Sequence, residues 1–298
     1  MPGREKPVES LSEFIACVSR FRQSWGLAEP KKRHKELWFR GESRDYGVTS
    51  LRPELYRVVG SDVSPKRILK LLDIENDLHN EFQRAADERY GGRISAENWD
   101  WDSYFLMQHH EGPTRLLDWS DGALMALHFA LRNRANDSED ARVYVLEPDK
   151  LNKCLDSLPE TKRFEKSWKA YVRKHPSYGL DEDDWEDGYL PADEDANKEL
   201  KLPRPPVVLD FPLITRRIAA QRSRFIAFGT DPLWLSKEFK KANSTIKAIT
   251  IAAGSRSKLR LELRDCGVTE SVIYPDLDGL GREMKQIWQD RKSTVEKS

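Results

Sequence analysis

The chain lacks the features that mark several specialised classes of protein. Its three cysteines are widely separated, which disfavours a disulfide framework or a cysteine-based metal site and favours a reducing compartment. No apolar run approaches the roughly 18 residues of a membrane span, and no basic segment followed by an apolar core stands at the N-terminus. We therefore expect a cytoplasmic protein without a membrane partner.

Net charge is also missing, because 50 basic and 50 acidic residues cancel. A nucleic-acid partner would therefore have to be bound by a local patch of basic residues. Large apolar side chains are plentiful, with nine tryptophans, eleven phenylalanines and nine tyrosines among 298 residues. That length allows one large domain or two small ones, and the sequence contains no internal repeat.

Apolar residues at helical spacing predict several helices. Ser10 and Glu13 form a capping box at the start of the first, and a long amphipathic helix follows over residues 65–90. We expect solvent around the polar face of the long helix, which carries Asp73, Glu75, Asp77, Glu81 and Arg84. A helix over 123–132, capped by Ser120 or Asp121, has small residues that allow it to approach a sheet closely.

Strands are predicted between these helices and in the C-terminal part of the chain. Their expected ranges are 37–42, 142–146, 207–209, 246–252 and 272–274. Two more helices are expected over 257–266 and 277–289, and the last should turn its apolar residues inward, namely Leu280, Met284, Ile287 and Trp288. Because strands and helices alternate without the rhythm of a doubly wound sheet, we predict the α+β class.

One domain accounts for most of this pattern. We expect a helical lead-in over residues 1–30, the domain itself over 31–290 and a disordered tail over 291–298. Residues 181–199 include ten acidic residues and one lysine, a composition that repels itself and predicts an insertion or a mobile loop. Trp185 and Tyr189 offer the alternative that this segment is docked on the domain.

Three short segments combine charged and apolar residues in an unusual way. The first ends a strand with Phe39-Arg40-Gly41, where an arginine suits the binding of an anion or cofactor or, equally, a core carboxylate. The second covers residues 108–120, and the third covers 216–228. Each is too polar to bury cheaply and too apolar for an ordinary exposed loop, so we expect a functional role, with a structural loop as the alternative.

The middle segment holds most of the chemically active side chains. His109 and His110 are adjacent, so they point apart on a regular element, and no third histidine or cysteine lies near to complete a metal site. A histidine that works as an acid or base is the better hypothesis, because imidazole titrates near neutral pH. We therefore predict no metal and assign His109 as a candidate catalytic residue.

The three segments together resemble the FRG domain family, which is named for its aromatic-Arg-Gly motif. Phe39-Arg40-Gly41 fits that motif, and residues 108–119 fit a second motif of the form Gln-His-x-Gly-x-Pro-Thr-Arg-Leu-Leu-Asp-Trp, altered around His110 and Glu111. A third motif resembles residues 221–225 but lacks a glycine, and closing features resemble residues 267–268 and 274–279.

The order of these motifs is similar to that in ADP-ribosyltransferases. The resemblance implies a single domain with a central mixed or antiparallel split sheet flanked by helices, and it implies NAD as substrate. By this resemblance Arg40 holds a phosphate or ribose, and the residues that bind NAD are Arg40, Gly41, Thr114, Arg115, Trp119, Ser120 and Arg217. The catalytic residues are Arg40, Asp118, Gln221 and His109. Gln221 stands where these enzymes place a glutamate, so Asp118 is expected to supply the negative charge.

Three functions are compatible with the sequence. The first is an NAD-using ADP-ribosyltransferase-like effector, a bacterial toxin or antiphage protein that modifies a nucleic acid or a protein. The second is a non-catalytic nucleotide or nucleic-acid binding module that uses basic residues, namely 31–35 with Arg115, Arg217, Arg222 and Arg224. The third is a partner-binding domain in which Arg115 and Asp118 form a buried pair.

Overall fold

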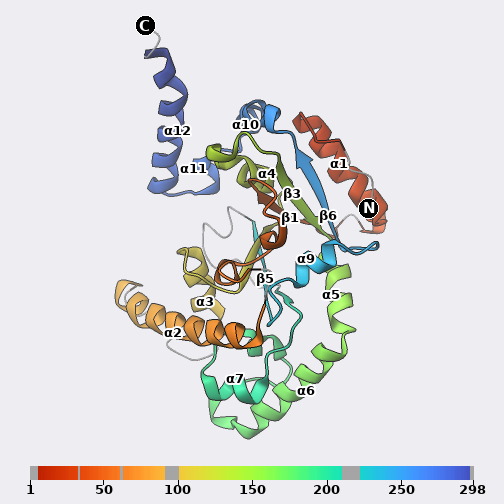
Figure 1. Cartoon of the computed structure of the whole chain (residues 1–298), viewed down its shortest axis with the longest axis vertical. Helices are drawn as coiled ribbons and strands as arrows, with labels where there is room; N and C mark the ends of the chain where they lie inside the picture. The colour runs from red at the N-terminus through yellow and green to blue at the C-terminus, as the bar shows by residue number, and fades with distance from the viewer. Residues whose placement is uncertain (1–5, 33, 61–62, 91–100, 210–221, 296–298) are drawn as a thin grey trace.

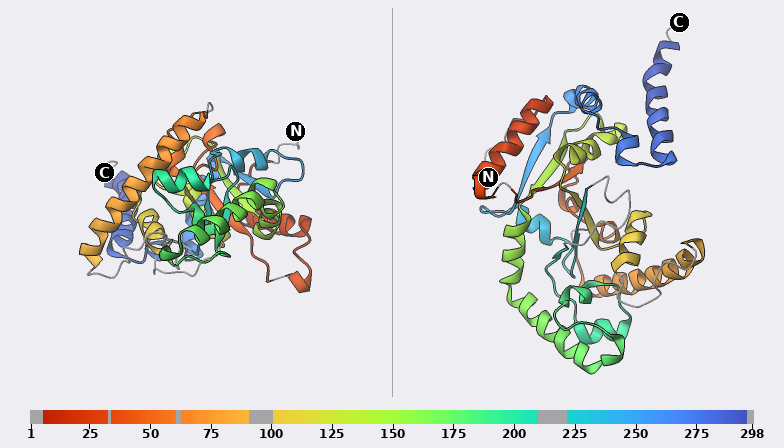
Figure 2. Two further views of the ribbon diagram at one scale, coloured as in Figure 1. Left: turned by 90° about the horizontal axis from the view of Figure 1, so that it is seen from below. Right: turned by 180° about the vertical axis from the view of Figure 1, so that it is seen from behind.

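A six-stranded antiparallel sheet forms the centre of the protein (Figures 1 and 2). The computed structural model describes residues 6–32, 34–60, 63–90, 101–209 and 222–295. The strands lie in the order β4-β5-β2-β1-β3-β6. Their bounds are β1 Trp38–Glu42, β2 Leu116–Ser120, β3 Ala141–Leu146, β4 Val207–Leu209, β5 Ser223–Ala227 and β6 Ile246–Ile251. The predicted α+β class is confirmed, and four of the five predicted strands are present.

The sheet is nearly divided in two at its centre. β1 and β2 are neighbours, but they pair at one position, Phe39 with Ser120. By contrast, β1 pairs with β3 at five positions, and β2 pairs with β5 at five. Beyond Phe39 and Ser120 the two strands separate, which leaves a fork between the β4-β5-β2 half and the β1-β3-β6 half.

Each half of the sheet has its own covering helices. The β1-β3-β6 half packs with α1 (Leu11–Ser24), α4 (Ala123–Arg132) and α10 (Arg256–Asp265), whereas the other half packs with α3 (Trp101–His109), α6 (Pro159–Lys174) and α7 (Glu194–Leu200) (Figure 1). The remaining helices among the described residues are α2 Pro65–Tyr90, α5 Pro148–Asp156, α9 Trp234–Phe239, α11 Glu270–Ile273 and α12 Leu277–Val295. Short 3₁₀ turns cover Pro30–Lys32, Gly47–Thr49, Glu54–Tyr56, Arg134–Asn136, Pro176–Tyr178, Trp185–Tyr189 and Ala253–Ser255. Among the described residues, none of the helices is both long and apolar enough to span a membrane.

α4 approaches β1 more closely than a side chain would allow. A Cβ atom on Gly41 would lie 1.9 Å from the carbonyl oxygen of Ala126 and 2.5 Å from the amide nitrogen of Ala130. The small residues of this helix therefore allow it to approach the sheet closely, as their pattern predicted. The predicted cap was wrong, because Gly122 is the N-cap and the Ser120 hydroxyl accepts a hydrogen bond from the Gly122 amide at 3.1 Å, one residue before the helix begins.

The polar face of α2 is not wholly in solvent, contrary to expectation. Glu75 is fully buried, and its carboxylate forms an ion pair with the Arg115 guanidinium. The Arg115 amide donates to Glu75 at 2.8 Å, and the Tyr104 hydroxyl donates to the same carboxylate. Sequence periodicity could not show this, because it places Glu75 on a polar face without showing which residue meets it.

Arg115 extends this network across the protein. Its two terminal nitrogens donate to the carbonyl oxygens of Phe228 at 3.0 Å and Tyr189 at 2.7 Å. The guanidinium therefore connects α2, the start of β2, the residue after β5 and the acidic segment. Asp118 takes no part in this network, so the alternative in which Arg115 and Asp118 form a buried pair is wrong.

The acidic segment over 181–199 is packed against the domain. Tyr189 is fully buried, and the Trp101 indole nitrogen donates to Asp187 at 2.8 Å. The neighbouring helix α6 supplies opposite charges, including ion pairs from Lys169 to Asp183 at 2.7 Å and from Arg173 to Glu182 at 2.6 Å. The structure therefore follows the docked alternative, since burial of aromatic rings and ion pairing offset the repulsion among the carboxylates.

The C-terminal region departs from two expectations. Residues 270–273 form the short helix α11 in place of the predicted strand, with Thr269 as its extended N-cap. α12 projects from the body of the molecule (Figure 1), and its apolar residues Leu280, Met284 and Trp288 are 45%, 49% and 60% exposed. The inward orientation predicted for them was wrong, because α12 extends beyond the rest of the described chain. The helix also continues to Val295, into the segment expected as a tail.

We predict that Glu75→Ala lowers the free energy of unfolding by about 3–5 kcal/mol, because it leaves the buried Arg115 guanidinium without its counter-charge. Denaturant titration followed by circular dichroism measures this change. Glu81→Ala on the same helix is the matched control: Glu81 is exposed and pairs with Arg84 in solvent, so its loss should cost less than about 0.5 kcal/mol. Equal effects of the two substitutions would contradict the structural role given to Glu75.

Candidate functional site

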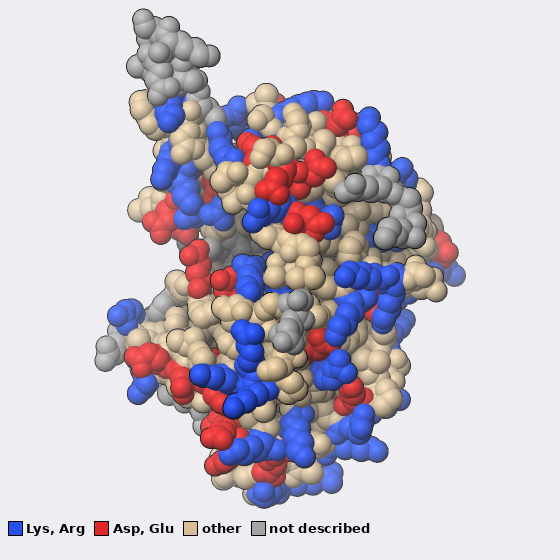
Figure 3. All heavy atoms as spheres, in the orientation of Figure 1, with Lys and Arg blue, Asp and Glu red and all other residues tan. Residues whose placement is uncertain are grey.

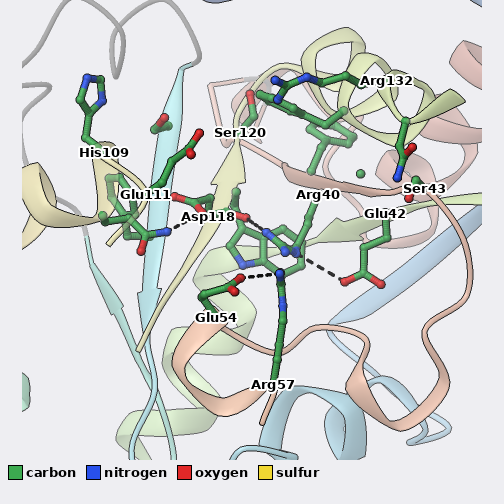
Figure 4. Close-up of a pocket in the computed structure, with 18 of the residues that line it drawn as sticks. Arg40, Glu42, Ser43, Glu54, Arg57, His109, Glu111, Asp118, Ser120 and Arg132 are labelled. Carbon is green, nitrogen blue, oxygen red and sulfur yellow. Dashed lines mark hydrogen bonds and ion pairs between the residues drawn. The ribbon is translucent and has the colours of Figure 1, made fainter. Parts of the chain in front are cut away.

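The fork between β1 and β2 opens into a cavity of about 970 Å³. Its walls come from β1, β2, β5, the end of α3, the end of α4 and the loop that follows β1 (Figure 4). Charged and polar lining residues include Arg40, Glu42, Glu54, Arg57, Gln108, His109, Glu111, Asp118, Ser120 and Arg132. Aromatic lining residues are Phe39, Tyr46, Phe105, Trp119, Phe129, Phe225 and Tyr274. Described residues of all three unusual sequence segments therefore meet in one place, with Ser223 and Phe225 contributed by the third.

Arg40 bridges the fork. Its side chain starts from β1, and one terminal nitrogen donates a hydrogen bond to the backbone carbonyl oxygen of Asp118 on β2 at 2.8 Å. The Nε atom of the same guanidinium lies 3.5 Å from Glu42 (Figure 4). Arg40 thus meets a carboxylate, as one sequence-based alternative expected, and because it also lines the cavity, its binding of an anion or cofactor stays a prediction.

Asp118 faces the cavity. Its carboxylate accepts a hydrogen bond from the Gln108 side-chain amide at 2.7 Å. The surrounding walls restrict hydration of the carboxylate and raise the pKa of Asp118 above the usual aspartate value, although Arg40 and the Gln108 hydrogen bond act in the opposite direction. Asp118 is nevertheless exposed at the cavity, so a ligand can reach its carboxylate there.

Thr114 and Arg115 act from behind the cavity wall. Thr114 is fully buried, and its hydroxyl donates to the side-chain oxygen of Gln108 while it accepts from the Leu116 amide at 3.1 Å. The chain of hydrogen bonds from Thr114 through Gln108 to Asp118 fixes the aspartate. Arg115 is bound to Glu75, so neither residue lines the cavity as a ligand contact.

His109 and Glu111 stand on the opposite wall from β1. His109 ends α3, and its ring lies edge-on to the His110 ring at 4.9 Å between centroids. Glu111 has a positive φ of 64°, a conformation that costs a non-glycine residue energy and that is often found at functional sites. In the part of the chain that the structure describes, no group of three or more potential ligands is placed to hold a metal ion.

Gly41, Trp119 and Ser120 form the wall itself. Gly41 is required for the close contact with α4, and Trp119 is 2% exposed within the apolar core behind the cavity. Ser120 lines the cavity and pairs with Phe39 in the sheet. These three residues shape the site, and of them the Ser120 hydroxyl is the polar group placed to meet a ligand.

The structure adds charged residues that the sequence had not indicated. Arg57 enters the cavity from the loop after β1 and pairs with Glu54 at 2.6 Å. Arg132, at the end of α4, donates to the Tyr274 hydroxyl at 2.8 Å. No motif surrounds these arginines, so no sequence signal distinguishes them from ordinary surface cations. Glu42 was adjacent to a recognised motif and could have been included.

Part of the predicted site lies outside the described residues. Arg217 and Gln221 belong to the segment 210–221, outside the described residues. Arg222 and Arg224 are described, and both form ion pairs with Asp121.

The basic residues proposed for nucleic-acid binding are largely matched by carboxylates. Arg115 is buried against Glu75, and Lys35 pairs with Asp149. On the face shown in Figure 3, basic side chains are interspersed with acidic ones. This distribution does not favour an extended phosphate-binding surface made of the residues that were expected to form it.

Comparison with known families bears on the N-terminal half of the chain. The FRG domain family model matches residues 35–139. The chain contains an FRG domain. Both the Phe39-Arg40-Gly41 motif and residues 108–119 lie within the match, so the FRG resemblance is confirmed, whereas the third motif at 221–225 lies outside it. Neither a curated protein nor a solved structure matches the chain.

The FRG domain's Asp118 should reveal its environment in the pH dependence of stability. A folded-state pKa above the unfolded value stabilises the fold at low pH, and this contribution is lost as pH rises through the raised pKa. We therefore expect Asp118→Asn to increase the free energy of unfolding at about pH 7 and to increase it less at about pH 4. Denaturant titrations at both pH values measure the difference.

Asp183→Asn serves as a control with the opposite sign. The ion pair with Lys169 lowers the pKa of Asp183, so its contribution is present at neutral pH and lost on acidification. This substitution should reduce stability at about pH 7, and the reduction should shrink at about pH 4. A pH-independent effect of Asp118→Asn would show that its carboxyl has an ordinary pKa.

Proposed function

We propose that this FRG-domain protein is an NAD-using enzyme of the ADP-ribosyltransferase type that modifies a nucleic acid or a protein. The observation that carries the proposal is the meeting of Arg40 and Asp118, from two separate motifs, across the fork of the sheet. They meet at a cavity of about 970 Å³, near the upper end of the range of roughly 300–1,000 Å³ for ligand pockets. A dinucleotide is a large ligand of matching size.

The cavity walls suit the parts of such a ligand. Tyr46 lines the cavity and is 39% exposed, so it offers an aromatic surface to a base, and the buried, stacked rings of Phe105 and Phe225 support the wall. Arg57 and Arg132 supply guanidinium groups for the two phosphates, because a planar guanidinium can bind two oxygens at once. Arg40 is already bound to the Asp118 carbonyl, so it contributes positive potential and holds the fork in shape.

In the proposed reaction the bond between C1′ of ribose and the nicotinamide nitrogen breaks, and nicotinamide leaves as a neutral molecule. A nucleophile of the target then bonds to C1′ and loses a proton. Positive charge develops on the ribose as the first bond breaks, so a carboxylate fixed beside it lowers the barrier. Asp118, held through Gln108, is assigned this role, and His109 is assigned to accept the proton.

The biological setting that we propose is a bacterial toxin or antiphage effector. This part rests on the resemblance of the motif order to that of ADP-ribosyltransferases. Binding of a nucleotide without transfer is the alternative function, and it predicts binding without release of nicotinamide.

The test is incubation of the purified chain with NAD labelled in its adenylate part. Binding, nicotinamide release and transfer of label to a cell lysate are measured separately. We expect Arg40→Ala to reduce nicotinamide release by about 100-fold to 1,000-fold, because it removes positive potential from the reacting site and the hydrogen bond to the Asp118 carbonyl. Arg44→Ala is the matched control, because Arg44 pairs with Glu139 and does not line the cavity.

Three results would decide between the functions. Absence of NAD binding by the unsubstituted chain would overturn the proposal. Binding without nicotinamide release or label transfer would favour the non-catalytic module. Equal activity of Arg40→Ala and Arg44→Ala would mean that the reaction takes place away from this cavity.

A further inference from the structure

Glu42 is a buried carboxylate at the wall of the cavity. Its side chain is 7% exposed and extends from β1 beside the Arg40 guanidinium (Figure 4). A buried carboxylate normally has each oxygen satisfied by hydrogen-bond donors, because an unsatisfied one costs free energy. The environment of Glu42 meets this requirement for one oxygen and not for the other.

The first oxygen, Oε1, has a structural role. It accepts a hydrogen bond from the Leu51 amide at 2.9 Å, and Arg40 Nε lies 3.5 Å away. Leu51 has a positive φ of 57°, so this hydrogen bond holds a strained turn in the loop that forms one wall of the cavity. One oxygen is therefore sufficient to explain how Glu42 supports the fold.

The second oxygen, Oε2, is buried and has no hydrogen-bond partner among the described residues. The Nε atom of Arg40 is also buried without one. An acceptor and a donor are thus both unsatisfied on neighbouring side chains that line the same cavity. A hydroxyl group can donate to a carboxylate and accept from a guanidinium, so it meets both requirements at once.

We infer that Glu42 binds a sugar hydroxyl of the ligand through Oε2, with Arg40 Nε as the accompanying donor. This inference rests on the proposed function, which brings a ligand with two riboses into the cavity. It assigns to Glu42 a role separate from that of Asp118, since Glu42 recognises the sugar and Asp118 stabilises the charge that develops on it. The inferred selectivity is for nucleotides that retain the ribose hydroxyls.

Glu42→Gln separates the two roles of the residue. The glutamine oxygen can keep the hydrogen bond from Leu51, which preserves the strained turn. Oε2 is replaced by an NH₂ group, which donates hydrogen bonds and therefore cannot accept one from a ligand hydroxyl. Glu147→Gln is the matched control, because Glu147 is also buried and accepts a backbone amide, from Lys150, but lies outside the cavity lining.

The experiment measures dissociation constants by calorimetry for NAD and for its 2′-deoxy and 3′-deoxy forms, altered in either ribose. For the unsubstituted chain, removal of the engaged hydroxyl should weaken binding by about tenfold or more, the effect of losing a hydrogen bond to a charged group. For Glu42→Gln, the binding of NAD should weaken by a similar factor. NAD should then bind no more tightly than that deoxy form. Glu147→Gln should keep the full advantage.

The ratio between NAD and its deoxy forms makes the outcomes distinct. A general loss of structure would weaken all ligands alike and leave the ratio unchanged, so a changed ratio reports the hydrogen bond itself. If Glu42→Gln binds NAD but discriminates against every deoxy form as strongly as the unsubstituted chain, the inference is overturned and the proposed function stands. If the unsubstituted chain does not bind NAD, both fail together.

Discussion

The buried ion pair between Glu75 and Arg115 is the interaction on which the rest of the structure depends. A buried charge without a partner is strongly destabilising, so each residue requires the other. The Arg115 guanidinium also binds the carbonyl oxygens of Tyr189 and Phe228. A long helix, a central strand and the acidic segment are thereby joined at the start of β2, three residues before Asp118.

The fork in the sheet converts this scaffold into a site. Since β1 and β2 pair only at Phe39 and Ser120, the backbone beyond that point is free to line a cavity. Arg40 closes part of the gap through the Asp118 carbonyl, and Gly41 lets α4 press against β1 from the other side. The short motif Phe39-Arg40-Gly41 therefore lies both where α4 packs closely against β1 and where β1 separates from β2.

Residues 108–120 are too polar to bury cheaply and too apolar for an exposed loop. The structure explains this mixture, because some residues of the segment are buried and others line the cavity. Thr114 and Arg115 are buried, with every charge or hydroxyl matched, whereas His109 and Asp118 face the cavity. Gln108 connects the two groups, because it accepts from Thr114 and donates to Asp118. A motif of this kind is at once a core element and a site.

Local sequence was sufficient for most elements and for the motifs of the FRG domain. Helical spacing and a capping box located α1, and β-branched and aromatic runs located β3 and β6, because these signals depend on neighbours in the chain. It did not determine which polar residues would meet. Glu75 is 40 residues from Arg115, and Arg57 belongs to no motif. Tertiary structure also decided the exposure of α12, because an apolar face indicates burial without indicating what will cover it. It likewise decided the helical form of residues 270–273, because the strand preference of a β-branched pair is weak and depends on its surroundings.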